Sequence, residues 1–125
     1  MDVHEERTFA EELQRFDGLY NKLGSMQECS DVEEILDYLV DIYYTTRRIT
    51  LHVLIRDEPF TIESATEFSD RIVDMIPSIV DMGITLGRSP VQVRIKEKCF
   101  NYFRLQQTLR EQSEAIRRWI EDVLA

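Results

Sequence analysis

The clearest structural signal in this chain is the stretch from Ser30 to Ile42, which reads SDVEEILDYLVDI. Ser30 is followed three residues later by Glu33, the spacing of a capping box, in which side chains satisfy free N–H groups at a helix start. Apolar residues then recur at steps of three and four, which is typical of a helix with one buried face. These residues are Val32, Ile35 or Leu36, Leu39 and Ile42.

The same periodicity precedes this stretch and continues after it. It predicts an earlier helix from about Glu5 to Leu23, which Gly24 ends because glycine enters the left-handed region without steric cost. The stripe of this helix is Phe9, Leu13, Phe16, Tyr20 and Leu23. Residues 43–46 (YYTT) are poor helix formers, so the helix after Ser30 should fray there. Thr50 would then cap a short third helix, and a strand over 49–55 is the alternative, since β-branched residues are frequent in it.

The second half of the chain opens with a break at 57–59 (DEP). Thr61 or Ser64 should begin the next helix, and Pro77 should kink or divide it because proline lacks an N–H group. Residues 83–87 (GITLG) form a predicted loop. Ser89 and Pro90, an N-cap followed by an N1 proline, should start a last helix that continues to the end of the chain. Unbroken, that helix would be about 50 Å long, so it either bends near 106–113 or projects as a coiled-coil arm.

These elements predict an all-α fold, a compact bundle of about five helices with a long C-terminal helix. A chain of 125 residues is long enough for one domain with one core. We therefore expect a single domain over 1–125, with a core over about 5–110 and residues 111–125 as the segment that would project.

The net charge of −9 is unevenly distributed, with acids dominating 1–42 and bases outnumbering acids in 84–125. An acidic front half argues against direct nucleic-acid binding, which needs clustered bases. One small cluster of basic residues remains, which consists of Arg88, Arg94, Lys96, Lys98 and Arg104. It is either a solvent-exposed helix face or a binding site for an acidic segment of a partner. We expect an intracellular protein with reduced Cys29 and Cys99, because no signal peptide or membrane span is apparent.

The sequence has few groups of residues that could carry out catalysis or bind a metal ion. His4 and His52 lack ligand partners at metal-binding spacing, and no nucleophile–base set can be assembled. We therefore expect no enzyme activity, no metal and no cofactor. The aromatic residues near 43–44 and 100–103 either belong to the core or line a groove. Trp119 is harder to bury, so it is an alternative anchor for an interface.

Two stretches resemble the helical domain at the N-terminus of transcription elongation factor S-II and Elongin A, and its integrase-binding variant in lens-epithelium-derived growth factor. The first is 31–42, followed by Ile49-Thr50 and Val53-Leu54, and the second is 74–76 with 91–98, similar to the family's last core helix. The sequence around 13–16 is also similar to the variant's opening helix. The resemblance implies a nuclear scaffold that binds short disordered acidic segments, each with an aromatic or aliphatic anchor, from transcription or chromatin factors.

Carried onto this sequence, the resemblance places partner binding at two loops. The first loop is Met26, Gln27 and Glu28; the second is Ile84, Thr85 and Leu86, with Lys96 and Lys98 as its cationic edge. An apolar pair on a glycine-flanked loop suits a peptide anchor, although the same pair would also plug the end of a bundle. The rival hypothesis is a self-associating structural or adaptor protein, whose long C-terminal helix forms a homodimer or coiled coil.

Overall fold

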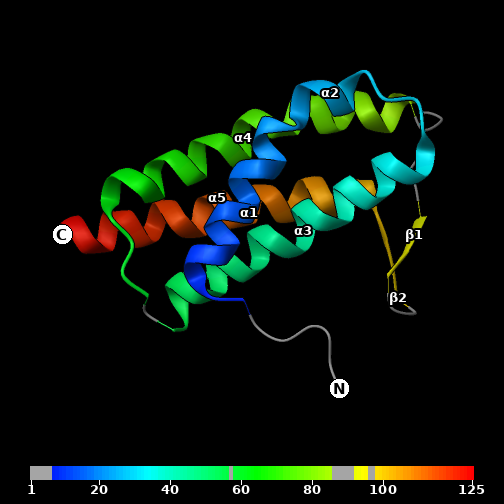
Figure 1. The fold of residues 1–125 in the computed structure, drawn as a ribbon. Helices are drawn as coiled ribbons and strands as arrows, with labels where there is room; N and C mark the ends of the chain where they lie inside the picture. Colours follow the sequence, from blue (N-terminus) through cyan, green and yellow to red (C-terminus); the bar gives the residue numbers. More distant parts are fainter. Residues whose placement is uncertain (1–6, 57, 86–91, 96–97) are drawn as a thin grey trace.

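A computed structural model of the protein describes residues 7–56, 58–85, 92–95 and 98–125, without the side chains of residues 32, 83–85, 92–95 and 98–103. In these parts of the chain five helices and one short hairpin follow one another (Figure 1). The elements are α1 (Phe9–Asn21), α2 (Leu23–Gln27), α3 (Val32–Leu54), α4 (Ile62–Thr85), β1 (Gln92–Ile95), β2 (Lys98–Asn101) and α5 (Tyr102–Leu124). The predicted all-α bundle with a long C-terminal helix is confirmed.

The three long helices α3, α4 and α5 make up most of the bundle. α5 packs against both α4 and α3, α1 packs against α3, and α2 packs against α4 (Figure 1). Apolar side chains from all five helices share one buried core. Its largest fully buried members include Phe16, Met26, Ile35, Leu39, Ile42, Ile49, Ile72, Met75, Ile79, Leu105 and Leu109.

α1 is shorter at both ends than the predicted helix from Glu5 to Leu23. It begins after Thr8, whose side chain accepts a hydrogen bond from the Glu11 N–H while the Glu11 carboxylate accepts one from the Thr8 N–H. The prediction that Gly24 ends this helix is wrong. Lys22 separates α1 from α2 in an ordinary right-handed conformation, and Gly24 lies inside α2, so no left-handed glycine is needed.

The start and the length of α3 both correct the sequence-based prediction. The N-cap is Asp31 and not Ser30: its carboxylate accepts hydrogen bonds from the N–H groups of Glu33 and Glu34. The helix neither frays at 43–46 nor restarts at Thr50, and the strand alternative is wrong as well. Ile42, Ile49 and Val53 are buried in the core, and this tertiary packing outweighs the weak helix propensity of the intervening residues.

α4 begins after Thr61, which is the first of the two predicted starts. The Thr61 hydroxyl accepts a hydrogen bond from the Ser64 N–H at 3.0 Å. Pro77 lies inside the helix and does not divide it. The carbonyl that Pro77 leaves without a helical partner is that of Val73, a residue that is 41% exposed. α4 extends to Thr85, so the predicted loop over 83–87 is helical in its first part.

The largest correction concerns the segment before α5. The sequence predicts one helix from Pro90 onward, whereas β1 and β2 form an antiparallel pair in which Val93 lies opposite Phe100. Residues 91–96 (VQVRIK) alternate strictly between apolar and polar, which is the period of a strand. Residues 92–95 and 98 are therefore strand residues and not part of the core helix that the family resemblance implies for this stretch, and its other residues lie outside the described parts of the chain.

α5 stays on the bundle for most of its length. Leu105, Leu109 and Ile116 are fully buried, and Trp119 and Ile120 are partly buried against the core. The segment 111–125, which we expected to project if the last helix did not bend, thus contains buried residues up to Ile116 and partly buried residues at Trp119 and Ile120. Residues 121–125 are exposed.

Candidate functional site

The residues that the resemblance implies for partner binding lie in different environments. Met26 is 2% exposed and belongs to the core, whereas Gln27 and Glu28 are exposed at the end of α2. Ile84 and Thr85 are the last two residues of α4, the helix against which α2 packs (Figure 1). Leu86 and Lys96 fall outside the described residues, and Lys98 is the first residue of β2.

Trp119, the alternative anchor, packs inward. Its ring lies 6.1 Å from the ring of Phe60, centroid to centroid, and it contacts the core cluster. Phe60 in turn lies 5.2 Å from Phe9 and 6.3 Å from Phe68. Trp119 therefore packs α5 against the segment that precedes α4. This contact explains a tryptophan at this position without requiring a partner protein.

A groove of about 730 Å³ lies between α3 and α5, and none of its described lining residues belongs to the predicted loops. We call it the α3–α5 groove. Its lining residues come from one side of each helix: Tyr43, Arg47, Thr50 and Leu51 from α3, and Arg104, Gln107, Thr108, Glu111 and Gln112 from α5. The lining carries two guanidinium groups and one carboxylate on a chain whose net charge is −9.

Arg47 is held in the groove by Tyr43, one helical turn earlier. The Arg47 Nη1 donates a hydrogen bond to the Tyr43 hydroxyl at 2.8 Å, and its guanidinium carbon lies 5.3 Å from the centre of the Tyr43 ring. Most arginines of the described residues lie close to an acid, as Arg15 does to Asp41 at 2.9 Å, but none of the carboxylates that the structure describes lies within 4.0 Å of Arg47. Its charge is thus positioned and still able to bind an anion.

The floor of the groove is a buried polar network between the two helices. The Thr50 hydroxyl donates to Gln112 Oε1 at 2.8 Å, and Gln112 Nε2 donates to the Thr46 hydroxyl at 3.3 Å. Thr46 also donates to the Ile42 carbonyl at 2.8 Å. Because these buried groups are paired, the network fixes the position of α5 relative to α3 without an unsatisfied polar group.

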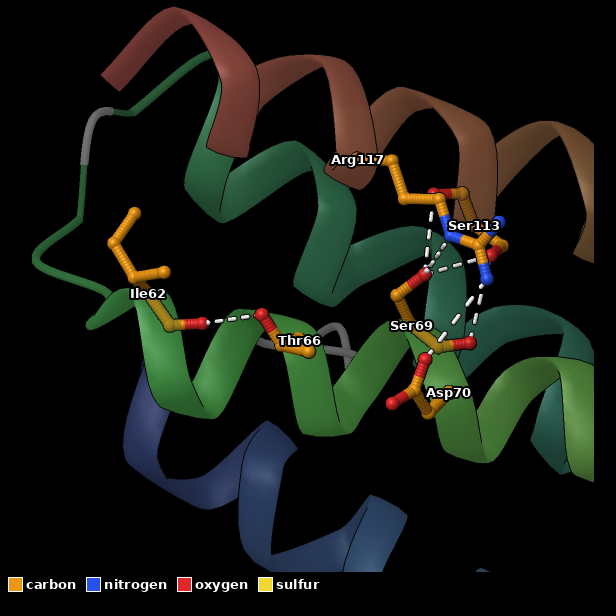
Figure 2. A network of polar contacts seen from close by, with 6 residues as sticks. All are labelled: Ile62, Thr66, Ser69, Asp70, Ser113 and Arg117. Carbon is orange, nitrogen blue, oxygen red and sulfur yellow. Dashed lines mark hydrogen bonds and ion pairs between the residues drawn. The ribbon is translucent and has the colours of Figure 1, made fainter. Parts of the chain in front are cut away.

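The other side of α5 is fastened to α4 by a second network, shown in Figure 2. Ser69 Oγ and Ser113 Oγ lie 2.7 Å apart, and the Arg117 Nε donates to Ser69 Oγ at 3.2 Å. Arg117 Nη2 is also 3.9 Å from the Asp70 carboxylate. Small side chains let α4 and α5 approach closely, and so α5 is held from both sides. The groove wall is therefore largely preformed.

Apolar surface borders one end of the groove. Leu51 lines it and is 50% exposed, and Leu54 and Ile55 near the end of α3 are also exposed. The groove thus combines positively charged groups, a polar floor and an aliphatic edge. A peptide that carries both acids and an apolar side chain has the matching chemistry.

The α3–α5 groove is not apparent from the sequence, because the weak helix formers at 43–46 predict that the second helix ends there. With α3 continuous, Tyr43, Arg47 and Leu51 fall at successive intervals of four residues on one side of it. The basic group singled out from the sequence contributes one member, Arg104. The pairing of α3 with α5 has no signal in the sequence, because the two helices are far apart along the chain.

The fold and the groove together define a helical bundle with an open groove between two of its long helices, and the described lining of this groove includes two arginines and one glutamate. No known protein family, no curated protein and no solved structure matches the chain. Among the described residues, no three His, Cys, Asp or Glu side chains are grouped in a way that could hold a metal ion. None of the described helices has both the length and the apolar character that crossing a membrane requires.

Proposed function

We propose that this protein is an interaction module that binds short, disordered acidic segments with an aliphatic or aromatic anchor, and that the α3–α5 groove is its binding site. The observation that carries the proposal is Arg47, a guanidinium that Tyr43 positions and that pairs with no carboxylate in the described parts of the chain, in a groove whose edge is the exposed Leu51. Complementary charge steers an acidic partner to the groove, and a buried apolar contact supplies most of the binding energy.

The chemistry of the groove supports binding and not catalysis. The described residues that line it carry guanidinium, hydroxyl, amide and aliphatic groups and one carboxylate, and no histidine or cysteine is among these residues. Nucleophilic catalysis needs an adjacent base to activate a hydroxyl, and Thr50 is already committed to Gln112. A role for the module in a transcription or chromatin assembly in the nucleus is part of the proposal. Its support is the resemblance of 31–42.

The proposal is tested with a fluorescently labelled peptide rich in Asp and Glu with one central Leu, titrated with the protein while anisotropy is recorded. Reversing the charge in Arg47→Glu should weaken binding by about tenfold or more, because a positioned cation becomes a repelling anion. Arg110→Glu is the matched control, since Arg110 is exposed on α5 but does not line the groove. Equal losses in both variants would mean that only overall charge matters, and the proposal would fail.

A third variant separates the α3–α5 groove from the loops that the resemblance implies. Ile84→Ala combined with Leu86→Ala should leave the affinity for the peptide unchanged. If this variant loses binding while Arg47→Glu keeps it, the binding site is at the loops and not in the groove.

Self-association is the second candidate function, and one observation favours it. Val123 and Leu124 are exposed at the end of α5, at 52% and 70%. Two copies could cover these side chains by pairing their C-terminal helices. Light scattering should then show a dimer that Val123→Ser with Leu124→Ser converts to a monomer. A monomeric wild-type protein would eliminate this candidate.

A further inference from the structure

A pocket of about 540 Å³ lies where the start of α1 meets the end of α3 and the segment that precedes α4. We call it the α1 pocket. Its described lining comes from residues 7–10, from His52 and Arg56, and from Glu58 and Pro59, and none of these residues lines the α3–α5 groove. The volume is within the range of about 300–1,000 Å³ that is typical of small-molecule sites.

Contacts between three segments of the chain hold the walls of the α1 pocket. The ring of Phe9 lies 5.5 Å from the imidazole of His52 and 5.2 Å from the ring of Phe60, centroid to centroid. The Glu58 N–H donates to the His52 carbonyl at 3.1 Å, which holds the segment before α4 against the end of α3. The pocket is therefore largely preformed, and a ligand would not have to order its walls.

The first turn of α1 leaves two backbone donors at the pocket. The Glu11 N–H donates to the Thr8 hydroxyl, and the Glu12 N–H donates to the Thr8 carbonyl. The N–H groups of Phe9 and Ala10 precede these bonds and have no partner within the helix. Both residues line the pocket. Free N–H groups at the positive end of a helix favour an anion.

A buried histidine is an independent indication of a ligand at this place. His52 is 7% exposed, and it lines the pocket. Its Nδ1 is buried without a hydrogen-bond partner. A buried polar group without a partner is costly, and an anion in the pocket would accept a hydrogen bond from the imidazole. The histidine and the helix start therefore favour the same kind of ligand.

The charged side chains of the pocket also favour an anion. Arg7 and Arg56 contribute two guanidinium groups, against the one carboxylate of Glu58 in the described lining. The Arg7 Nη1 lies 3.9 Å from the Glu12 carboxylate, a loose ion pair that leaves most of its N–H donors available. Backbone, guanidinium and imidazole donors come from different elements. Such a set suits the tetrahedral oxygens of a phosphate better than the two coplanar oxygens of a carboxylate.

We propose that the α1 pocket binds the phosphate group of a small phosphate monoester. The phosphate oxygens accept hydrogen bonds from the N–H groups of Phe9 and Ala10 and from the side chains of Arg7 and His52. A phosphate group fills only part of the pocket, and the remaining volume beside Phe9 and Pro59 accommodates the organic part of the ester. This site is separate from the α3–α5 groove, so it does not rest on the function proposed above.

The test is a titration of the ¹⁵N-labelled protein with phenyl phosphate, followed by the amide NMR signals. The signals of Phe9 and Ala10 should shift until they saturate, whereas acetate at the same pH and ionic strength should leave them unchanged. Arg7→Gln should weaken the affinity for phenyl phosphate by about tenfold, because a charge-assisted hydrogen bond is lost. Arg110→Gln is the matched control on the exposed side of α5, outside the described lining, and should leave the affinity unchanged.

A second variant tests the imidazole itself. His52→Phe keeps a ring beside Phe9 and removes both ring nitrogens. Because Nδ1 has no partner to lose, the bundle should stay intact, which circular dichroism checks, and the affinity for phenyl phosphate should fall by about fivefold. Wild-type affinity in this variant would overturn the assignment of His52 to the phosphate site.

Three further results would overturn the proposal. Equal shifts of the Phe9 and Ala10 signals with acetate would show that the pocket does not select a phosphate. Equal weakening in Arg7→Gln and Arg110→Gln would show that only overall charge matters. A phosphoserine peptide that binds at least tenfold more tightly than phenyl phosphate would assign the pocket to a phosphorylated protein partner instead of a small molecule.

Discussion

The carboxylate of Glu12 lies 3.7 Å from the Nε of Arg48, although the Glu12 side chain is only 1% exposed. Arg7 is the second cation close to Glu12, and its Nη1 lies 3.9 Å from the carboxylate. Neither carboxylate oxygen accepts a hydrogen bond, and Thr45 Oγ1 and His52 Nδ1 on α3 are also buried without a partner. The contact between α1 and α3 therefore contains buried polar groups that are poorly paired, in contrast to the well-paired network between α3 and α5.

Replacing Glu12 with methionine should stabilise the protein by about 1–3 kcal/mol. A buried charge with imperfect pairing costs more in desolvation than it gains, and an apolar side chain of similar volume removes that cost. Arg48 is partly exposed and already lies 5.4 Å from the Tyr44 ring, so it keeps a favourable environment. Urea unfolding measures the change in free energy of unfolding. A loss of several kcal/mol would show instead that the ion pair holds α1 on the bundle.

Asp31→Ala should destabilise the protein by about 1 kcal/mol, because it removes the acceptor for two free N–H groups at the start of α3. Ser30→Ala is the matched control at the neighbouring exposed position and should change stability by less than about 0.5 kcal/mol. Thermal unfolding followed by circular dichroism distinguishes them. The opposite order of the two effects would place the N-cap at Ser30.

The charge of Glu11 should make the stability of α1 depend on pH in the acidic range. Hydrogen bonds from the Thr8 backbone and side chain hold the pKa of the Glu11 carboxyl below its ordinary value of 4.5. Because the folded pKa is the lower one, the stabilisation is present above pH 4.5 and disappears as the pH falls through the folded pKa. Melting temperatures of the wild type and Glu11→Gln should differ at neutral pH and converge in acid. A difference that is the same at every pH would contradict this.

Tyr38 links α3 to the end of α1 by a hydrogen bond, and removing its hydroxyl should lower the free energy of unfolding. Its buried hydroxyl donates to the Leu19 carbonyl at 2.5 Å. Tyr38→Phe should cost about 1 kcal/mol at neutral pH, the net value of one such bond.

Tyr38 should also make the stability of the protein depend on pH in the alkaline range. Burial raises the pKa of the Tyr38 hydroxyl above its ordinary value of 10.0. A raised folded pKa gives stability that is present below pH 10 and is lost as the pH rises further. The wild-type advantage over Tyr38→Phe, measured by urea unfolding, should therefore shrink above pH 10. An advantage that grows in alkali would mean that the phenolate is stabilised in the folded protein.

Part of the fold follows from local sequence patterns. The apolar stripe of the first helix is a clear example: Phe9 and Phe16 are buried, and Leu13, Tyr20 and Leu23 pack against the core. The stripe at Ile35, Leu39 and Ile42 is buried in the same way. A period of 3.6 residues places such side chains on one face regardless of what covers them, so the sequence alone determines the helical class and the inward faces.

The tertiary structure decides what local patterns leave open. Residues 43–46 are poor helix formers, yet α3 passes through them because Ile42 and Ile49 on either side are buried in the shared core. The groove depends on the tertiary structure even more strongly, since Thr50 and Gln112, which form its floor, are 62 positions apart in the chain. Nothing in either segment specifies its neighbour. Only the packing of α5 between α3 and α4 brings Arg47 and Leu51 to the edge of a groove, because a binding surface between helices depends on how they pack and not on either helix alone.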